Sequence, residues 1–352
     1  MADIIIFLGC FFTVVTFLFN IIITIAQAKR SYNLKHKESF YSLCLCSAIL
    51  IFSFILFIFL FAFYDFIISI IILIASGTLF SLFLIFNGIH YLLVYKKRDS
   101  VKKETDFTGR ESLHHELIRK IFHIILFFGI IALLVGAFEA LLYVNGFYDV
   151  QKILDTFWGS LDGLNMCHLG NFDFGQGIIF MFFLLLTTIF TINEGARLGK
   201  WFYFPLTKVA SIGIREKEKE TVASYVYFTI GMLFSSIFLY PVPLFSIIGI
   251  LCFADTAASL FGRKYGTHKL QFNRTKSWEG SIAGFIVCLI VTFVLVGFVW
   301  GLVASIVFLI VDAITPILPL SDNIGIPIAV TSAYLLLSLL QIPMYSLIFS
   351  LL

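Results

Sequence analysis

The chain has 352 residues, of which 60% are hydrophobic and only 13% are charged, and its formal net charge is +3. Its mean hydropathy is +1.01. A soluble domain carries about a quarter charged residues, and the charges here are clustered between apolar runs longer than the roughly 20 residues that cross a bilayer. The composition therefore excludes an ordinary soluble protein and predicts an all-α, polytopic integral membrane helical bundle.

A series of apolar segments runs along the chain. The first is expected to be a membrane span and not a cleaved signal peptide, because it is too long and no basic residue precedes it. Residues 280–317 are too many for one perpendicular helix and just enough for two thin ones. We therefore expect about ten transmembrane helices, with about nine as the alternative. The segments lie at about 4–26, 43–64, 66–95, 118–143, 176–193, 222–240, 243–262, 280–317 and 326–350.

Basic residues are confined almost entirely to four linkers, which carry all but one of the 24 Lys and Arg residues. If the spans before residue 263 alternate, the linkers at 27–42, 96–120, 194–221 and 263–279 lie on the same side of the membrane. The positive-inside rule assigns that side to the cytoplasm. The N-terminus is then expected outside.

Asp255 is an acidic residue inside an apolar segment, about eight residues from its cytoplasmic end and so roughly 12 Å deep. Ala258, Ser259 and Gly262 follow at i+3, i+4 and i+7 and form a stripe of small residues beside it. This stripe fits helix–helix packing, with the acid paired to a neighbouring span. We favour a magnesium ligand, because Mg²⁺ takes one or two carboxylates with substrate phosphates and charges inside spans mark function.

A basic loop follows this segment directly. Gly262-Arg263-Lys264-Tyr265-Gly266 combines backbone-freeing glycines with two cations, and Lys276-Ser277-Trp278-Glu279-Gly280 leads into the next span. Ser277 is expected to cap the helix that begins at Trp278, whose N-terminus favours phosphate. A basic run beside a membrane is by itself ordinary topology or lipid-headgroup attraction. Together with Asp255 it indicates an anion site, although no P-loop motif occurs in the chain.

Polar residues also mark the ends of other spans. Arg119-Lys120 opens the fourth segment, and His123 lies one helical turn after Arg119 on the same face. Basic residues in this position are ordinarily snorkelling anchors, and packing explains the histidine as well as a functional role does. Glu194 and Arg197, at the end of the fifth segment, have the i, i+3 spacing of an ion pair.

Further polar residues lie toward the C-terminus. Arg215 and Glu218 belong to a run of charged residues that is expected mostly to face solvent. Both are also candidates to reach the anion site beside Asp255. Asp312 lies inside the long apolar segment, and Asp322 and Asn323 follow it. The last two can supply metal or ribose ligands only if the long segment crosses the membrane twice. This requirement is a second reason to expect two helices there.

Together these elements resemble the CTP-dependent polyprenol kinase family, which includes dolichol kinase, phytol kinase and the CTP-dependent diacylglycerol kinase of fungi. The elements keep the family's order, and the block from Asp255 to Ser281 is the most specific. Asp312 departs from the family, in which a glutamate precedes the Asp-Asn pair. The matching elements are Arg119-Lys120-x-x-His123, Glu194-x-x-Arg197, Arg215-Glu216-x-Glu218, Asp255-x-x-Ala258-x-x-x-Gly262-Arg263-x-x-Gly266, Lys276-Ser277-x-Glu279-Gly280-Ser281 and Asp322-Asn323-x-x-x-Pro327.

The resemblance implies transfer of the γ-phosphoryl group of CTP to the hydroxyl of a long-chain lipid alcohol, with Mg²⁺ as cofactor. Residues 111–352 would form the catalytic membrane domain, and residues 1–110, with three spans, an accessory bundle. The expected membrane is the plasma membrane of a prokaryote or the endoplasmic reticulum of a eukaryote, with the site on the cytoplasmic face. CTP, the lipid alcohol and the bilayer are the expected partners, without nucleic acid.

The resemblance also implies roles for individual residues. Asp255 would hold Mg²⁺ with Asp322 or Glu279, and Asp255, Glu279 and His123 are candidates for the base. The full catalytic set is Asp255, Lys276, Glu279 and His123. The expected nucleotide- and phosphate-binding residues are Arg119, Lys120, Arg197, Gly262, Arg263, Lys264, Gly266, Ser277, Gly280 and Asn323. The expected supporting residues are Glu194, Arg215, Glu218, Ser259 and Asp312.

Alternatives from two classes are left open. Residues 276–280 also resemble phosphatidate cytidylyltransferase, which makes a CDP-lipid and releases pyrophosphate, but residues 319–327 lack its acidic C-terminal signature. An ion-coupled transporter would use Asp255 and Asp312, and it predicts inverted repeats and polar groups at mid-membrane. The sequence shows neither feature, and a purely structural scaffold leaves Asp255 and its basic loop unexplained. We therefore prefer the kinase.

Overall fold

The computed structural model describes residues 2–60, 77–78, 81–89, 121, 124–125, 127–132, 135–136, 139, 174–199, 203–205, 207, 214, 218–315 and 317–345. Within these ranges the chain is helical, with no strand beyond one bridge between Lys269 and Ser277, which confirms the predicted all-α class. Six described helices are long and apolar enough to cross a membrane, and two further apolar helices are shorter. The total of about ten stays a prediction, because the segments at 66–95 and 118–143 lie largely outside the described residues.

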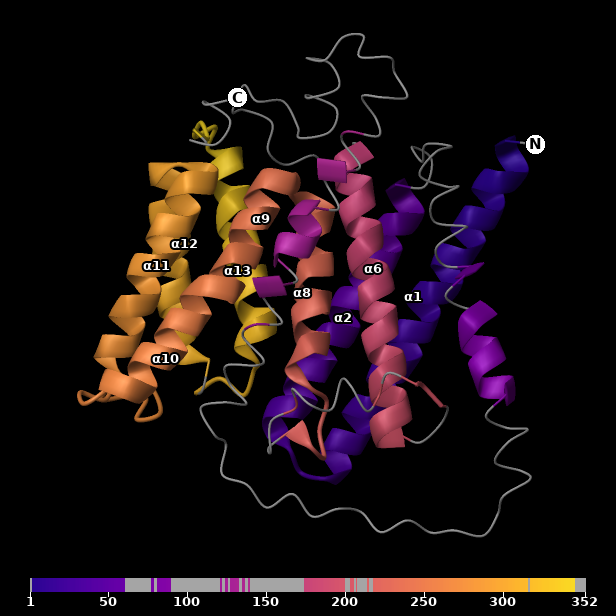
Figure 1. The fold of residues 1–352 in the computed structure, drawn as a ribbon, viewed down its shortest axis with the longest axis horizontal. Helices are drawn as coiled ribbons and strands as arrows, with labels where there is room; N and C mark the ends of the chain where they lie inside the picture. Colours follow the sequence, from indigo (N-terminus) through magenta and orange to yellow (C-terminus); the bar gives the residue numbers. More distant parts are fainter. Residues whose placement is uncertain are drawn as a thin grey trace.

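The N-terminal half of the described bundle consists of α1 (Ala2–Asn33), α2 (Lys37–Leu60), α6 (Phe174–Glu194) and α8 (Ser224–Phe238). In this half α1 packs against α2 and α6, and α8 packs against α2 and α6 (Figure 1). Asn20 links α1 to α6, because it donates to Thr188 Oγ1 at 2.9 Å and accepts from Thr191 Oγ1 at 2.5 Å. Hydrogen bonds of this kind hold helices together where lipid removes the hydrophobic drive between them.

The C-terminal half begins with one long helical run. This run comprises α9 (Pro241–Gly249), the π-helical turn η5 (Ile250–Ala254) and α10 (Asp255–Tyr265). A π-helical turn inserts an extra residue into an α-helix and occurs frequently at functional sites. The turn ends immediately before Asp255, so it sets the direction in which that carboxylate leaves the helix.

The two-helix interpretation of residues 280–317 is confirmed. They form α11 (Trp278–Val296) and α12 (Phe298–Ile314), which pack against each other. The helices meet at Gly297, whose φ of 84° is a conformation that glycine adopts without steric cost. The chain thus returns to the end of the bundle where α11 began, and α13 (Asp322–Leu339) starts from there.

Several helix ends differ from the predicted apolar segments. The first helix continues to Asn33 and the second begins at Lys37, where the segments ended at about 26 and began at about 43. Hydropathy marks only the part of a helix that lies in lipid, whereas backbone hydrogen bonding continues into the polar turns beyond it. The last helix begins at Asp322 and ends at Leu339, not at 350, and the chain turns through a positive φ of 55° at Gln341.

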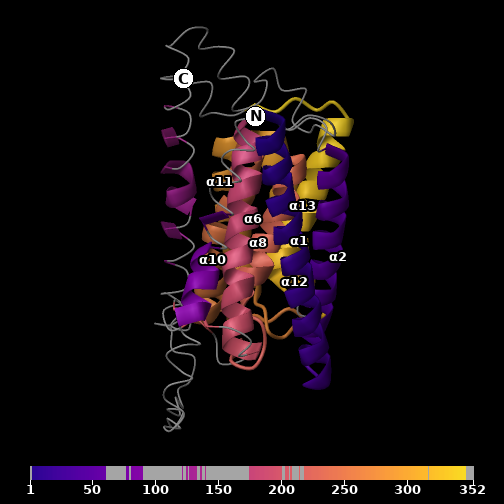
Figure 2. The same ribbon diagram turned by 90° about the vertical axis from the view of Figure 1, so that its right-hand side faces the viewer.

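The helices share one general direction, as Figures 1 and 2 show. In Figure 1, α10 to α12 lie on the left, α1 and α6 on the right, and α8, α9 and α13 between them. The α1–α2 turn, the end of α6 and the α10–α11 loop all lie at the lower end. Basic linkers 27–42, 194–221 and 263–279 thus have described parts at one end of the bundle, as the charge pattern predicted. The linker at 96–120 lies outside the described residues.

The helices α10 and α11 approach each other so closely that α11 needs glycine at position 280. A Cβ atom on Gly280 would lie 2.7 Å from the carbonyl oxygen of Ala258 and 2.9 Å from Cα of Gly262. These neighbours are backbone atoms, which cannot turn aside as a flexible side chain does. Gly262 and Gly280, expected to bind phosphate, therefore also set the distance between the two helices.

We predict that Gly280→Ala lowers the free energy of unfolding by about 1–3 kcal/mol, because the added methyl group overlaps the backbone of α10. Thermal unfolding in detergent should show a lower midpoint than for the wild type. Gly88→Ala is the matched control, since no atom of the described residues lies within 4 Å of a Cβ atom there. Equal midpoints for the two variants would contradict the close contact.

Candidate functional site

A cavity of about 980 Å³ lies at the end of the described bundle that carries the α1–α2 turn and the α10–α11 loop. Its walls come from the α1–α2 turn, the segment leading into α8, the length of α10, the α10–α11 loop, the start of α11 and the end of α12 with the segment that follows. Small-molecule sites commonly measure about 300–1,000 Å³. Segments far apart in the sequence thus meet around a space large enough for a nucleotide-sized ligand.

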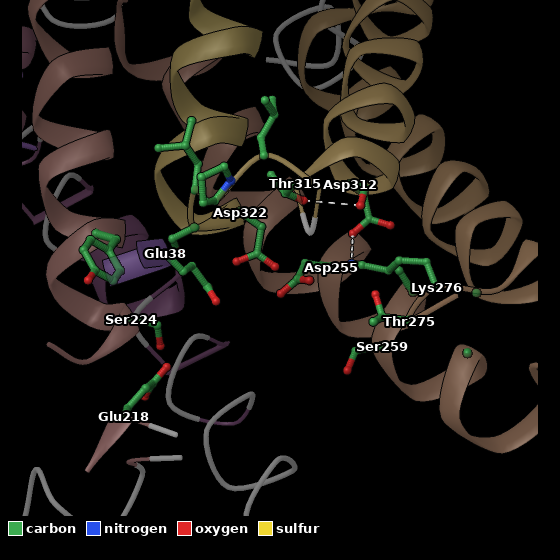
Figure 3. A pocket seen from close by; sticks show the side chains of 18 of the residues that line it. Glu38, Glu218, Ser224, Asp255, Ser259, Thr275, Lys276, Asp312, Thr315 and Asp322 are labelled. Carbon is green, nitrogen blue, oxygen red and sulfur yellow. Dashed lines mark hydrogen bonds and ion pairs between the residues drawn. The ribbon is translucent and has the colours of Figure 1, made fainter. Parts of the chain in front are cut away.

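Three aspartates and a lysine line one side of the cavity (Figure 3). Lys276 makes an ion pair with Asp312, whose side chain is 1% exposed, and Asp255 is buried close by. Burial disfavours the charged lysine, but the carboxylates of Asp312, Asp322 and Asp255 outweigh it and raise the pKa of Lys276. The structure therefore brings Asp255, Lys276 and Asp322 together around one cavity, as the resemblance implied. Their chemical roles stay predictions.

Asn273 positions the loop that carries Lys276. Its side-chain amide donates to the carbonyl of Ala313 at 2.8 Å, and its side-chain oxygen accepts from Thr275 Oγ1 at 2.6 Å and from the Thr275 backbone at 3.2 Å. The backbone N–H of Lys276 donates to the Asn273 carbonyl at 3.1 Å. These bonds pin the α10–α11 loop to the end of α12. No local pattern indicates this role, because Ala313 lies 40 residues away.

Many of the expected site residues do line the cavity. Ser277 caps α11 as predicted, because its hydroxyl accepts from the backbone N–H of Gly280 at 3.3 Å. The expected residues found in the lining, besides the three aspartates and Lys276, are Glu218, Ser259, Gly262, Arg263, Gly266, Ser277 and Gly280.

Glu279 lies outside this lining, although it was expected to be catalytic and to bind metal. Its carboxylate accepts from Thr267 Oγ1 at 2.8 Å and from the backbone N–H of His268 at 3.0 Å, and it contacts His268 Nδ1 at 2.7 Å. The reason is helical phase, since Ser277, Gly280 and Ser281 share a face of α11 and Glu279 lies on another. The structure thus corrects the expected placement, and Glu279 holds the start of the α10–α11 loop.

Lys264 and Asn323 are also missing from the lining of the described cavity. The ammonium of Lys264 lies 5.1 Å from the centre of the Tyr265 ring, in a cation–π contact away from the phosphate-binding position expected for it. Asn323 is buried, and its backbone N–H donates to Asp322 Oδ1 at 2.9 Å. Asn323 therefore helps to orient Asp322, which does line the cavity.

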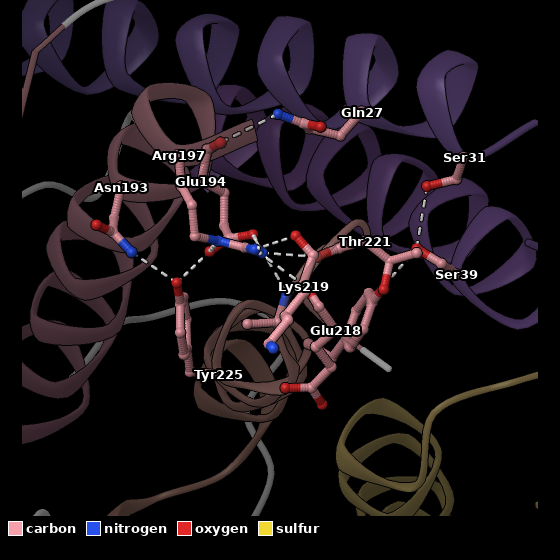
Figure 4. A network of polar contacts seen from close by, with 12 residues as sticks. Gln27, Ser31, Ser39, Asn193, Glu194, Arg197, Glu218, Lys219, Thr221 and Tyr225 are labelled. Carbon is pink, nitrogen blue, oxygen red and sulfur yellow. Dashed lines mark hydrogen bonds and ion pairs between the residues drawn. The ribbon is translucent and has the colours of Figure 1, made fainter. Parts of the chain in front are cut away.

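Arg197 sits in a buried polar cluster instead of the cavity lining (Figure 4). Its guanidinium donates to both carboxylate oxygens of Glu194, at 3.0 Å and 2.5 Å, so the expected i, i+3 ion pair is present. The same group donates to the carbonyls of Glu218 at 3.1 Å, Lys219 at 2.8 Å and Thr221 at 2.6 Å. This is a correction to the expected nucleotide contact, because all these donors are directed at the protein itself.

Glu194 completes this cluster from the end of α6. Its side chain is 1% exposed and accepts from the backbone N–H of Ala223 at 3.2 Å and from the hydroxyl of Tyr225. Together Glu194 and Arg197 fix the segment that carries Glu218 into the cavity wall. Their spacing predicted an ion pair, but the backbone that the pair holds lies more than 20 residues later in the chain.

The α1–α2 turn is part of the cavity and was not expected there. His36, Lys37, Glu38 and Ser39 line it, although residues 1–110 were expected to be accessory. Ser39 Oγ lies 3.0 Å from Ser31 Oγ and 3.1 Å from the hydroxyl of Tyr227 on α8, and these contacts fix the turn. A basic linker was the only signal here, and it could not show which segments the turn would meet.

Four expected site residues lie outside the described part of the chain. They are Arg119, Lys120, His123 and Arg215. The boundary expected near residue 110 lies outside it as well. Their expected roles stay predictions.

The cavity's donor set fits a magnesium ion that binds together with a nucleotide. Among the described residues, no group of three or more His, Cys, Asp or Glu side chains is arranged to hold a metal ion. Magnesium bound to a nucleotide needs only one or two carboxylates, since phosphates and waters supply its other ligands. Asp255 and Asp322 offer these carboxylates from the cavity wall.

The chain is similar to several curated kinases. It is 27% identical to phytol kinase 1 of Arabidopsis thaliana over 146 residues, which are 36% of this chain and 48% of that protein. It is 36% identical to CTP-dependent diacylglycerol kinase 1 of Saccharomyces cerevisiae over 101 residues, 28% of this chain and 34% of that protein. It is 27% identical to farnesol kinase of Arabidopsis thaliana over 175 residues, 46% of this chain and 57% of that protein.

These relatives belong to the CTP-dependent polyprenol and lipid kinase family. The resemblance predicted from the motifs is thereby confirmed. The matched part of the chain spans between about a third and somewhat over half of each relative's length. No family model matches the chain. No solved structure matches it either.

We predict that Arg197→Ala lowers the free energy of unfolding by about 3–5 kcal/mol, because it leaves the buried Glu194 carboxylate without its cation. The measurement is thermal unfolding in detergent, with Lys29→Ala as the control on an exposed cation of α1. A double variant, Arg197→Leu with Glu194→Leu, should recover part of the loss, because no buried charge then remains unpaired. Normal stability of Arg197→Ala with lost nucleotide binding would instead support the nucleotide contact first expected for Arg197.

Proposed function

We propose that this chain is a membrane lipid kinase that transfers the γ-phosphoryl group of CTP to the hydroxyl of a long-chain isoprenoid alcohol. The observation that carries the proposal is the single cavity that gathers Asp255, Lys276, Asp312 and Asp322 beside the glycine-rich α10–α11 contact. Relatives named for phytol, farnesol and diacylglycerol support a lipid hydroxyl as the acceptor. Isoprenoid alcohols are the first choice, including polyprenol and dolichol, and diacylglycerol is the alternative.

The charges of the cavity suit a nucleotide bound with a divalent cation. Phosphoryl transfer depends on positioning and on neutralising charge at the phosphates, with little covalent work for the protein. Three aspartates alone would repel a triphosphate. Magnesium on Asp255 and Asp322 would reverse this repulsion and supply positive charge to the phosphates. Lys276, held by Asp312, and Arg263 add protein cations to the same wall.

The opposite wall suits the nucleoside part of the donor. It presents Glu38, Ser39, Glu218, Ser224 and Tyr227, several of which are visible in Figure 3. Carboxylates and hydroxyls accept hydrogen bonds from sugar hydroxyls, and a carboxylate can accept from the exocyclic amine of cytosine. We place the phosphates at the Lys276 side and the sugar and base toward the α1–α2 turn.

The decisive experiment follows both halves of the reaction. Purified full-length protein in detergent is incubated with Mg²⁺, γ-labelled CTP and a panel of phytol, farnesol, dolichol, diacylglycerol and phosphatidate. The proposal expects CDP together with a labelled lipid phosphate, and the panel names the acceptor. Pyrophosphate together with a CDP-lipid would show a cytidylyltransferase instead. Absence of turnover with every acceptor would count against both enzymes and favour the transporter, which ion-flux assays would then test.

We predict that Asp255→Asn lowers kcat by about 100-fold or more, because the cavity loses a carboxylate that would hold the magnesium ion whose charge stabilises the transferring phosphoryl group. Expression and the unfolding midpoint should stay close to those of the wild type. Glu220→Gln serves as the control, since it removes an exposed carboxylate outside the cavity lining. A stable Asp255→Asn protein with full activity would rule out the proposed metal-binding role.

A further inference from the structure

Two buried polar atoms on residues that line the cavity have no hydrogen-bond partner among the described residues. They are Ser281 Oγ and Asp312 Oδ2. Ser281 is 3% exposed and Asp312 1% exposed, and both residues line the cavity. An unsatisfied buried donor or acceptor is costly, and each one in a folded protein calls for a physical explanation. A ligand that satisfies both atoms is the simplest explanation.

The hairpin of α11 and α12 places the two residues at the same level. The Thr292 hydroxyl donates to the Gly301 carbonyl at 3.2 Å near the turn. Further along, a Cβ atom on Gly284 would lie 2.9 Å from the Phe308 ring. Continuing this register for another turn sets Ser281 level with Asp312. The two atoms therefore lie on adjoining helices at the end of the hairpin that opens into the cavity.

The two carboxylate oxygens of Asp312 have different partners. Oδ1 is paired with Lys276, whereas Oδ2 has no partner among the described residues. An ionised carboxylate only accepts hydrogen bonds. An anionic phosphate oxygen cannot satisfy it, because two anions repel each other. The missing partner is therefore a cation or a group that donates a hydrogen. Lys276 already supplies a cation to Oδ1, so a hydrogen donor is the simpler partner for Oδ2.

Ser281 further restricts which ligand can bind here. Its hydroxyl can both donate and accept. An alcohol satisfies both atoms at once, because its hydrogen is donated to Asp312 and its oxygen accepts from Ser281. One lone pair of the alcohol oxygen then remains for attack on phosphorus. A phosphate oxygen could satisfy Ser281 but not Asp312.

We propose that the hydroxyl of the acceptor lipid binds between Ser281 Oγ and Asp312 Oδ2, and this inference rests on the proposed kinase function. The new bond forms between the alcohol oxygen and the γ-phosphorus. The bond between that phosphorus and its bridging oxygen breaks, and CDP leaves with the electron pair. The proton of the alcohol passes to Asp312 and afterwards to water. Asp312 thus takes the base role for which Asp255, Glu279 and His123 were the earlier candidates.

The contacts of neighbouring residues support the assignment of Asp312 as the base and Asp255 as a metal ligand. The Glu279 carboxylate is used by Thr267 and His268 outside the cavity. Asp255 is better placed for metal, at the turn where η5 meets α10. Lys276 holds Asp312 in place through Oδ1 and leaves Oδ2 to the acceptor. A base held in this way has the fixed geometry that proton transfer in a transition state requires.

The test compares Ser281→Ala and Asp312→Asn with the wild type, using phytol and CTP as probes. Ser281→Ala should raise the KM for phytol about five- to tenfold, because one hydrogen bond to the phytol hydroxyl is lost. The KM for CTP should stay unchanged. Asp312→Asn should lower kcat about 100-fold or more, the contribution of a general base. Binding of CDP by Ser281→Ala should stay within about twofold of the wild type. Ser332→Ala is the matched control, because Ser332 is an exposed helix serine bonded to the Ile328 carbonyl.

A second measurement tests how much the hydroxyl of phytol contributes to binding. The competing ligand is the hydrocarbon that carries hydrogen in place of the hydroxyl of phytol. The wild type should bind phytol more tightly than this hydrocarbon, and Ser281→Ala should lose most of the difference. Because the two side chains contact one hydroxyl, the double variant should lose less than the product of the single losses. Unfolding midpoints show whether the Asp312→Asn protein is folded, and Ser281→Ala supplies the test if it is not.

The outcomes separate the inference from the proposed function. If the wild type phosphorylates phytol and Ser281→Ala matches Ser332→Ala in the KM for phytol and in hydroxyl discrimination, the subsite is wrong and the kinase stands. Such a result would mean that the two atoms bind only water. If the wild type transfers no phosphate, the kinase proposal fails, and equilibrium binding of labelled phytol decides the subsite. Equal binding by wild type and Ser281→Ala would then overturn it as well.

Discussion

The ion pair between Lys276 and Asp312 is the interaction on which the rest of the site depends. Asp312 is buried near the end of an apolar helix, where a carboxylate without a cation is costly. Its cation comes from the α10–α11 loop, so the loop must fold back over the end of α12. Asn273 reinforces this arrangement through the carbonyl of Ala313. The loop, both helices of the hairpin and the wall that carries Asp255 are therefore fixed relative to one another.

The cluster around Glu194 and Arg197 has a comparable effect on the opposite wall. Five donor contacts from one guanidinium hold the end of α6 and the segment before α8 together. Buried ion pairs add little net stability compared with apolar packing, because desolvation offsets their attraction. Their contribution here is to hold polar groups in fixed positions at the helix ends beside the cavity wall. Preorganised charge of this kind is what phosphoryl transfer requires of a protein.

Local patterns predicted part of this arrangement and missed the rest. The length of residues 280–317 correctly indicated two helices, and the Ser277 cap followed from its residue type and position. Helical phase is also a local signal. It predicts that Glu279 lies away from the cavity, since Ser277 and Gly280 lie on a different face of the helix. The partners of Arg197 could not be predicted, because the carbonyls it binds are 21 to 24 residues further along the chain.

The sequence by itself determined the helical membrane class, the grouping of basic linkers at one end and the residues from Asp255 to Ser281 that relate the chain to lipid kinases. These features depend on composition, periodicity and short spacing, which the chain carries locally. Only the tertiary structure decided that the α1–α2 turn joins the cavity wall, that Asp312 takes Lys276 as its partner and that Ser281 and Asp312 each keep one atom unpaired within the part of the chain that the structure describes. These outcomes depend on which helix ends meet, and packing between distant segments sets that.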